Sequence, residues 1–174
     1  ELLIEEKYED LMASCEKIYR KETDRDFIKK AFFLAKEAHK GVRRRSGEPY
    51  MLHPIAVAQI AVDEIGLGSK SVVAALLHDV VEDTKYTFDD LVEIGFSEEV
   101  IATLRLLTHD KHTPYMEYIE RICKSGNRAA INVKLNDLRH NLARGREGGH
   151  MRCVEKHTIA LAYIERFLAE AESL

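Results

Sequence analysis

His78-Asp79-Val80-Val81-Glu82-Asp83-Thr84 is the stretch of sequence that decides the fold, because it sets four ionisable side chains within an otherwise apolar segment. Residues four apart on a helix lie on the same face, so the sequence predicts His78 beneath Glu82 and Asp79 beneath Asp83. The alanines and leucines just before this stretch and the valines within it make the other faces apolar, which predicts a buried helix. We therefore expect one helix with four charged groups along one edge.

Charged groups in a buried helix need partners. A divalent cation is the simplest partner for a cluster with excess carboxylate, because it offsets the desolvation cost that unpaired carboxylates would suffer. The alternative is a set of ion pairs with basic residues elsewhere, and for any one of the four residues alone this alternative is the better explanation. The four together favour a metal site.

Further ligands are expected from other segments, since one helix supplies only part of a coordination shell. His53 precedes Pro54, which keeps it outside the helix that is expected to begin at Pro54. Asp137 lies in an expected helix over residues 130–141, with Asn141 one turn further on. Two imidazoles and two carboxylates form a mixed nitrogen and oxygen shell, which suits manganese, iron or zinc better than calcium or magnesium. Manganese is our choice among these, although ligand type alone leaves the others open.

Three motifs in this order carry a family resemblance. They are residues 39–54 (HKGVRRRSGEPYMLHP), residues 74–84 (AALLHDVVEDT), and residues 134–141 with KLND at the start and HN at the end. The chain resembles the HD-domain metal-dependent phosphohydrolases, and more narrowly the hydrolase domain of the RelA/SpoT alarmone enzymes, over roughly residues 26–146. Three ordered motifs are far more specific than a lone His-Asp dipeptide. The resemblance implies an all-α, multi-helix HD-domain phosphohydrolase fold.

The resemblance also implies an activity, which is removal of the 3'-pyrophosphate from guanosine tetra- or pentaphosphate to leave GDP or GTP. One manganese ion per chain would be bound by His53, His78, Asp79 and Asp137. The acidic pair that activates or orients the attacking water would be Glu82 and Asp83. The substrate would be contacted by Arg44 and Ser46 at the guanine, Asn141 near the ribose and Lys111 at a phosphate.

The chemistry of the residues agrees with this implication. A metal held by four ligands keeps an open position for water, lowers the pKa of that water and polarises a phosphoryl oxygen. Glu82 is expected to take the proton, although a free Glu ionises near pH ~4.3 and needs an upward pKa shift to act as a base at neutral pH. Asp83 could instead only orient the water. The loop Arg43-Arg44-Arg45 offers guanidinium groups for phosphate or for stacking on a base, or it is simply a solvated loop.

Two departures from the family pattern put the choice of nucleotide in doubt. The order Leu138-Arg139 reverses the usual one, and Arg144 stands where the long members usually carry threonine. One rival is therefore a related phosphohydrolase that acts on NADPH or a nucleoside phosphate, and another is a non-catalytic nucleotide-binding module. The acidic pair argues against the module, since binding alone needs no water-activating carboxylates.

Length and composition set the outer limits. The 174 residues are expected to form one domain over 1–174, with an N-terminal amphipathic helix and a C-terminal helix packed on the core. A net charge of −4 disfavours nucleic-acid binding, so the expected partner is a small guanosine polyphosphate. The three cysteines, Cys15, Cys123 and Cys153, have no paired spacing and predict a reducing, cytoplasmic setting. No stretch is long and apolar enough to predict a membrane span. Periodicity does not decide the oligomeric state.

Sequence signals for the starts and ends of helices recur along the whole chain. The first expected helices cover part of 1–26, then 24–40 and 54–65, and a further one runs from a Ser69 cap through His78. Later helices are expected over 88–92 after a Thr87 cap, 98–107 after a Ser97 cap, 113–123, from Asn127 onward, and 153–172. A glycine-containing loop is expected over 144–149. Surface or hydrogen-bonded positions are expected for the histidines outside the metal set, namely His39, His109, His112, His140, His150 and His157, with His140 the one to watch because it adjoins Asn141.

Overall fold

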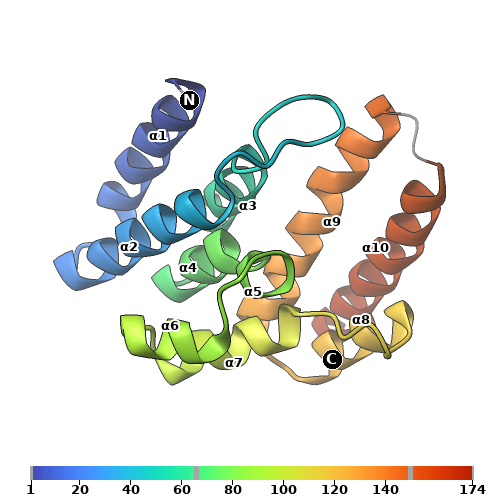
Figure 1. Ribbon diagram of the computed structural model, residues 1–174. Coiled ribbons are helices and arrows are strands. Elements are labelled where there is room, and N and C mark those ends of the chain that lie inside the picture. Colours follow the sequence, from blue (N-terminus) through green and yellow to red (C-terminus); the bar gives the residue numbers. More distant parts are fainter. Residues whose placement is uncertain (1, 65–66, 149–150, 174) are drawn as a thin grey trace.

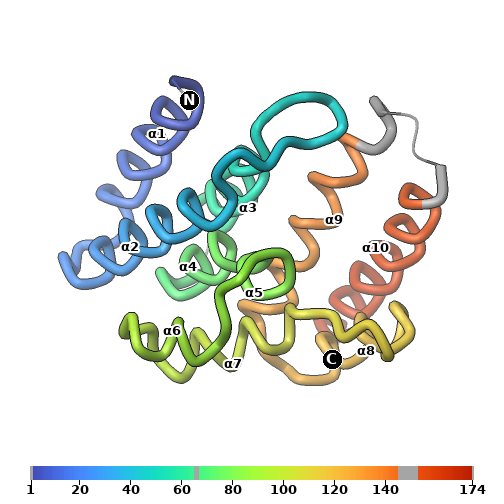
Figure 2. The backbone as a smooth tube through the Cα atoms, in the orientation of Figure 1, coloured from blue at the N-terminus to red at the C-terminus, as the bar shows by residue number. Residues whose placement is uncertain are grey.

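The computed structural model describes residues 2–64, 67–148 and 151–173, with side chains described for these except 145–148, 151 and 152 (Figures 1 and 2). The helices are α1 (Leu2–Ile18), α2 (Glu22–Ala38), α3 (Leu52–Asp63), α4 (Ser69–Leu77), α5 (Val80–Asp83), α6 (Phe88–Ile94), α7 (Glu98–Leu107), α8 (Tyr115–Lys124), α9 (Arg128–Gly148) and α10 (Met151–Glu172). Within these described ranges there is no strand, only an isolated bridge between Arg43 and Pro49. The all-α expectation is confirmed.

Helices α3, α4 and α9 form the centre of the fold. Helix α4 packs against α2, α3, α7 and α9, and α3 packs against α1 and α9. Figure 1 shows α1 and α2 on one side of this centre, α10 on the other, and α6 to α8 across one end. The short helix α5 follows α4 and lies at the front of the view. The N- and C-terminal helices thus contact the central helices from opposite sides.

The sequence explains why α3 and α4 are central. Every residue of α4 from Ser71 to Leu77 is buried, and α3 buries seven of its twelve residues. A helix that is apolar on all faces is stable only inside a domain, because each fully buried aliphatic side chain contributes about 1.5–3 kcal/mol.

No helix among the described residues has the length and apolarity required to cross a bilayer.

The helix expected to carry all four charged groups is interrupted, and this expectation is wrong. Helix α4 ends at Leu77, His78 and Asp79 form a turn, and α5 begins at Val80. The Nδ1 atom of His78 lies 2.6 Å from the carbonyl oxygen of Ala75. In a continuous helix this oxygen would accept from the backbone N–H of Asp79. A side chain that takes a backbone acceptor competes with the helical ladder, so the chain turns here.

Other helix boundaries also differ from expectation, including those of α3, α4 and α9. Helix α3 begins at Leu52, so His53 lies inside the first turn rather than before it. Proline is tolerated at Pro54 because the N–H groups of a first turn have no acceptor within the helix. Ser69 is the first residue of α4 instead of its cap. Helix α9 continues through Arg144 to Gly148, where a loop was expected, because a glycine costs a helix only about 1 kcal/mol and α10 packs along α9. The expectation for Gly149 lies outside the described residues.

The expected helix caps Thr87 and Ser97 are confirmed, and Asn127, where a helix was expected to start, is also a cap. The Thr87 side chain accepts from the N–H of Asp90, whose own carboxylate accepts from the N–H of Thr87, completing a capping box. The Ser97 and Asn127 side chains accept from N–H groups three residues later, at 3.3 and 3.0 Å. Polar residues at these positions satisfy N–H groups that the helix leaves unpaired.

Candidate metal centre

Four side chains from three distant segments converge at the centre of the fold. They are His53 in the first turn of α3, His78 and Asp79 at the turn between α4 and α5, and Asp137 in α9. Each offers one ligand atom, and these atoms all lie within 4.8 Å of one another. His53, His78 and Asp137 are buried, and Asp79 is partly buried. The structure therefore brings together the four residues that the sequence analysis selected.

Hydrogen bonds orient the His78 imidazole. A carbonyl oxygen only accepts, so Nδ1 of His78 carries the hydrogen that it donates to Ala75 at 2.6 Å. The Nε2 atom then faces the carboxylates, 2.9 Å from Asp79 Oδ2 and 3.2 Å from Asp137 Oδ1. A metal-bound imidazole uses one nitrogen for the metal and donates the other N–H to a fixed acceptor, which is the arrangement His78 has.

The carboxylates create a strongly negative field in this buried space. Burial acts to raise the pKa of Asp137, but Lys134 and His78 hold it well below its usual value. Burial likewise opposes ionisation of Asp79, while His78 lowers its pKa to about 2. Although burial opposes the charge, Asp79 and Asp137 raise the pKa of His78 well above its usual value. A positive charge is thus stabilised between the two carboxylates, as a cation bound there would be, so the donor set fits a metal.

Three residues that the sequence analysis did not assign to the site contact the ligands directly. Tyr50 donates from its hydroxyl to Asp79, Lys134 lies 3.0 Å from Asp137 Oδ2, and His140 Nδ1 lies 2.6 Å from His53 Nδ1. Tyr50 lies three residues before His53, and Lys134 and His140 lie three residues before and after Asp137. A search for polar residues three positions from each ligand on a helix would have found Lys134 and His140.

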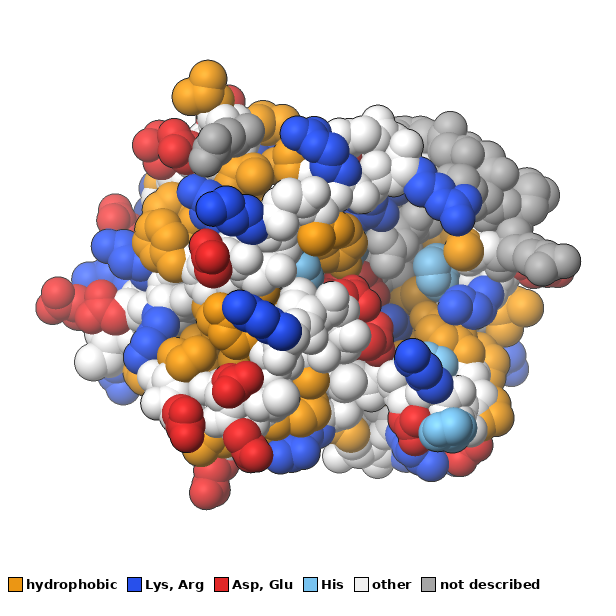
Figure 3. Space-filling model, viewed as in Figure 1, with side chains coloured by type: hydrophobic (Ala, Val, Ile, Leu, Met, Phe, Trp, Pro, Cys, Tyr) orange, Lys and Arg blue, Asp and Glu red, His pale blue; other side chains and the backbone are white. Residues whose placement is uncertain are grey.

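The acidic pair of α5 lies beside the metal group. Oxygen atoms of Asp79, Glu82 and Asp83 lie within 4.8 Å of one another, and Glu82 and Asp83 are exposed. The Glu82 carboxylate accepts a 2.6 Å hydrogen bond from the N–H of His109. Partial burial, followed by the charges of Asp79 and Glu82, raises the pKa of Asp83 to about 6. Figure 3, which has the same orientation as Figure 1, shows acidic side chains in a hollow near the centre of this face, with Lys and Arg side chains around the hollow.

The residues implied as substrate contacts divide into two groups. Arg44 Nη2 donates to Asn141 Oδ1 at 2.9 Å, and Asn141 Nδ2 donates to Asp137 Oδ1 at 3.1 Å, so both residues join the metal group. Ser46 and Lys111 instead lie exposed in the loops before α3 and α8. Ser46 Oγ donates to Glu48 at 3.5 Å. The structure places two of the four beside the ligands and two on flanking loops.

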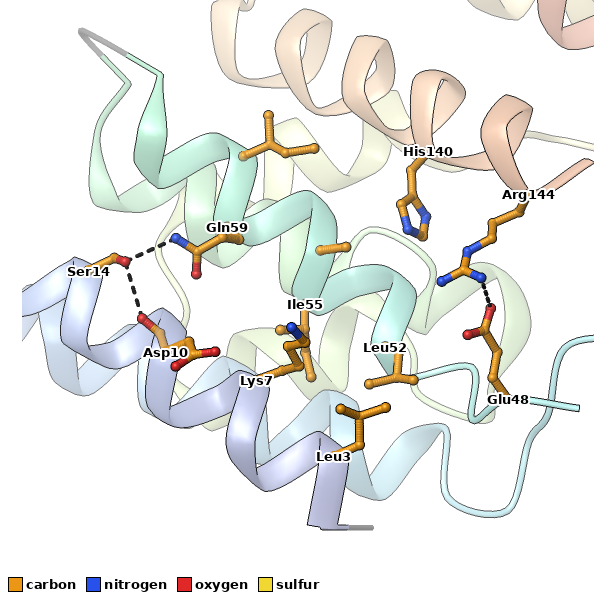
Figure 4. A pocket seen from close by; sticks show the side chains of 12 residues that line it. Leu3, Lys7, Asp10, Ser14, Glu48, Leu52, Ile55, Gln59, His140 and Arg144 are labelled. Carbon is orange, nitrogen blue, oxygen red and sulfur yellow. Dashed lines mark hydrogen bonds and ion pairs between the residues drawn. The ribbon is translucent and has the colours of Figure 1, made fainter. Parts of the chain in front are cut away.

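The two departures from the family pattern lie in different surroundings. Arg139 is exposed on α9. Arg144 Nη1 lies 3.2 Å from Glu48 Oε1 and lines a cavity of about 450 Å³ between α1, α3 and α9 (Figure 4). His140 lines the same cavity, and burial together with nearby His53 lowers its pKa to about 4.

The expectation for His39 is wrong, because this side chain is only 3% exposed and its Nε2 has no hydrogen-bond partner among the described residues. It is the C-terminal cap residue of α2, and its ring centroid lies 4.9 Å from that of Tyr50. His109 is hydrogen-bonded to Thr113, and His112 is exposed, as expected. His150 lies outside the described residues.

Comparisons with known proteins place this geometry in a family. The HD domain model matches residues 31–143. The chain is 40% identical over 139 residues to "Putative GTP diphosphokinase RSH1, chloroplastic" of Arabidopsis thaliana, covering 80% of this chain and 15% of that protein. It is 33% identical over 156 residues to "Bifunctional (p)ppGpp synthase/hydrolase SpoT" of Escherichia coli, covering 84% and 22%. This chain thus spans less than a quarter of the length of these two relatives.

A solved structure agrees with the sequence matches. It is described as "A metazoan ortholog of SpoT hydrolyzes ppGpp and plays a role in starvation responses", with a TM-score of 0.63 and 29% identity. The alignment covers 83% of this chain and 92% of that one. The helical fold and the buried group of His and Asp residues agree with these matches. This chain belongs to the HD-domain family and is related to the (p)ppGpp hydrolase domains of the SpoT and RelA proteins.

Proposed function

We propose that this chain is a manganese-dependent hydrolase that removes the 3'-pyrophosphate from guanosine tetra- or pentaphosphate, leaving GDP or GTP. The observation that carries the proposal is the buried group of His53, His78, Asp79 and Asp137 beside an acidic pair. Support also comes from relatives whose own names describe ppGpp hydrolysis and whose sequences align over most of this chain.

The proposed ligands are the two imidazoles and two aspartates. When bound, the ion supplies Lewis acidity toward a phosphoryl oxygen and toward a water molecule. When His78 is neutral, the hydrogen that Nδ1 donates to Ala75 leaves the Nε2 lone pair for the ion. The mixed nitrogen and oxygen donors are compatible with manganese, which is the metal we propose.

The acidic pair is proposed to prepare the attacking water. The water oxygen forms a bond to the phosphorus attached to the ribose O3', the bond from phosphorus to O3' breaks, and O3' leaves with the electron pair and takes up a proton. The sequence alone suggested Glu82 as the base. A base works best when its pKa lies near the working pH, so the pKa of about 6 supports Asp83 instead as the group that takes the proton from water. Glu82, held by the N–H of His109, is then the residue that orients the water.

Arg44 and Asn141 are proposed to bind the nucleotide beside the metal. The planar guanidinium of Arg44 is suited to stacking on a guanine base and to paired hydrogen bonds with a phosphate. Arg44 donates to Asn141, which in turn donates to Asp137, so the guanidinium is linked to the metal group through one side chain. Ser46 and Lys111 are proposed as further contacts that reach the substrate from exposed loops on either side.

A product assay tests the proposal. The manganese-loaded chain is incubated separately with guanosine tetraphosphate, NADPH and simple nucleotides, and pyrophosphate and orthophosphate are identified. We expect pyrophosphate from the tetraphosphate, and no release in EDTA. Orthophosphate from NADPH without pyrophosphate from the tetraphosphate would indicate a related phosphohydrolase, and neither product would indicate a binding module; both results contradict the proposal.

A further inference from the structure

His53 and His140 form a pair of imidazoles joined through the same type of nitrogen. Their Nδ1 atoms lie 2.6 Å apart, and their ring centroids are 4.8 Å apart with an interplanar angle of 30°. The other nitrogen of His53, Nε2, lies 2.7 Å from Asp137 Oδ1. His53 is therefore held at both nitrogens, by His140 on one side and by the metal group on the other.

This geometry leaves a single arrangement of protons when Nε2 binds a cation. Nε2 must then offer its lone pair, so the hydrogen of the neutral His53 ring is on Nδ1. Two nitrogens 2.6 Å apart share one hydrogen, which requires His140 Nδ1 to be the acceptor and to carry no hydrogen. The tautomers of both rings follow from one hydrogen bond.

The two proposed imidazole ligands obtain their acceptors differently. His78 donates to the backbone carbonyl of Ala75, which a substitution does not remove. His53 depends on a side chain, that of His140. Because α9 places Asp137 and His140 three residues apart, one helix supplies both a carboxylate ligand and the group that orients an imidazole ligand.

We propose that His140 is a positioning residue of the metal centre, which accepts the hydrogen bond from His53 Nδ1 and so directs His53 Nε2 toward the cation. This inference rests on the metal binding in the proposed function but assigns a role that the ligand set does not contain. Outer groups of this kind typically change metal affinity 10- to 100-fold when they are removed.

The chain permits a sharp test at this position. His140 borders the cavity between α1, α3 and α9, so a smaller or apolar replacement creates no sealed void in the core (Figure 4). The amide oxygen of asparagine occupies the same place relative to the backbone as the Nδ1 of histidine, and it accepts a hydrogen bond. His140→Asn therefore restores the acceptor, whereas His140→Leu removes it.

The experiment measures Mn²⁺ affinity by titration calorimetry and by electron paramagnetic resonance of the free ion. The samples are the native chain, His140→Asn, His140→Leu, and the control His112→Leu at an exposed histidine. Circular dichroism in EDTA checks that each variant is folded, and His140→Ala replaces the leucine variant if that one is not. Pyrophosphate release from guanosine tetraphosphate is measured in parallel.

We expect His140→Leu to bind Mn²⁺ ~10- to 100-fold more weakly than the native chain, with His140→Asn retaining most of the affinity and His112→Leu unchanged. Native affinity in His140→Leu, or equal losses in the asparagine and leucine variants, would overturn the inference while leaving the proposed function standing. Absence of Mn²⁺ binding by the native chain would overturn both. Tight native binding with the expected ranking but no pyrophosphate release would support the inference and contradict the proposed activity alone.

Discussion

Lys134 and Asp137 form a buried ion pair within one turn of α9, with Lys134 Nζ 3.0 Å from Asp137 Oδ2 and side chains only 13% and 6% exposed. The other oxygen, Oδ1, lies 2.7 Å from His53 Nε2 and 3.2 Å from His78 Nε2. One oxygen of the Asp137 carboxylate thus contacts a cation of the protein, and the other faces the proposed metal. Burial opposes the lysine charge, but Asp137 raises the pKa of Lys134 well above its usual value, so the pair stays ionised.

Removing this lysine should destabilise the metal-free protein. Lys134→Met leaves the Oδ2 atom of the buried Asp137 carboxylate without its ion-pair partner, and removing one partner of a buried pair typically costs about 3–5 kcal/mol in the free energy of unfolding. Urea denaturation in EDTA measures it. The control is Lys124→Met, which removes an exposed pair with Glu120 at 3.8 Å and should cost about 0–1 kcal/mol. Equal losses in the two variants would show that the Lys134 pair adds nothing specific.

The acidic pair should control turnover without holding the metal. We expect Glu82→Gln and Asp83→Asn each to lower kcat for pyrophosphate release by about 10²- to 10⁴-fold, with Mn²⁺ affinity little changed. Stopped assays and calorimetry measure the two quantities. Full activity in Glu82→Gln would remove that residue from the water-orienting role, and full activity in Asp83→Asn would remove the proposed base.

Asp83 should also make the stability of the metal-free protein depend on pH. Its pKa is raised to about 6 on folding, so the folded protein binds this proton more tightly than the unfolded chain does. Its contribution therefore favours folding at low pH and is lost as the pH rises through about 6. We expect Asp83→Asn in EDTA to have a higher Tm than the native chain above this range, with the difference shrinking toward about pH 4.

Thermal melts across this pH range, monitored by circular dichroism, check the expectation. Asp26→Asn, at an exposed carboxylate on α2, is the matched control and should track the native chain at every pH. A difference between Asp83→Asn and the native chain that does not vary with pH would mean that charge at position 83 is not the cause.

Arg44 should act on substrate affinity more than on the chemical step. Arg44→Lys keeps the charge but loses the planar fork and the 2.9 Å bond to Asn141. We expect KM for guanosine tetraphosphate to rise about tenfold with a smaller change in kcat, since uniform binding is what is lost. Arg139→Lys, at an exposed position on α9, is the control. A fall in kcat at unchanged KM would instead place Arg44 in the reaction step.

Several elements of the fold and site could be predicted because their signals are local. The capping residues Thr87 and Ser97 act on N–H groups three residues away, and those helix starts were predicted correctly. The break at His78 could not be predicted from periodicity, which describes the apolar faces but not a side chain that takes the Ala75 carbonyl. The extension of α9 beyond Arg144 was also missed, because packing against α10 outweighs the local cost of glycine.

The sequence by itself determined which donors are present, their order along the chain, the helical class of the domain and most of the helix starts, because these depend on residue chemistry and on neighbours within a turn or two. Only the tertiary structure decided that Asp137 meets His53 and His78 across 84 and 59 residues, and that His140 contacts His53 across 87 residues. Contacts over such separations arise when apolar helices pack together, and no pattern within a single segment specifies the direction in which a buried polar side chain then points.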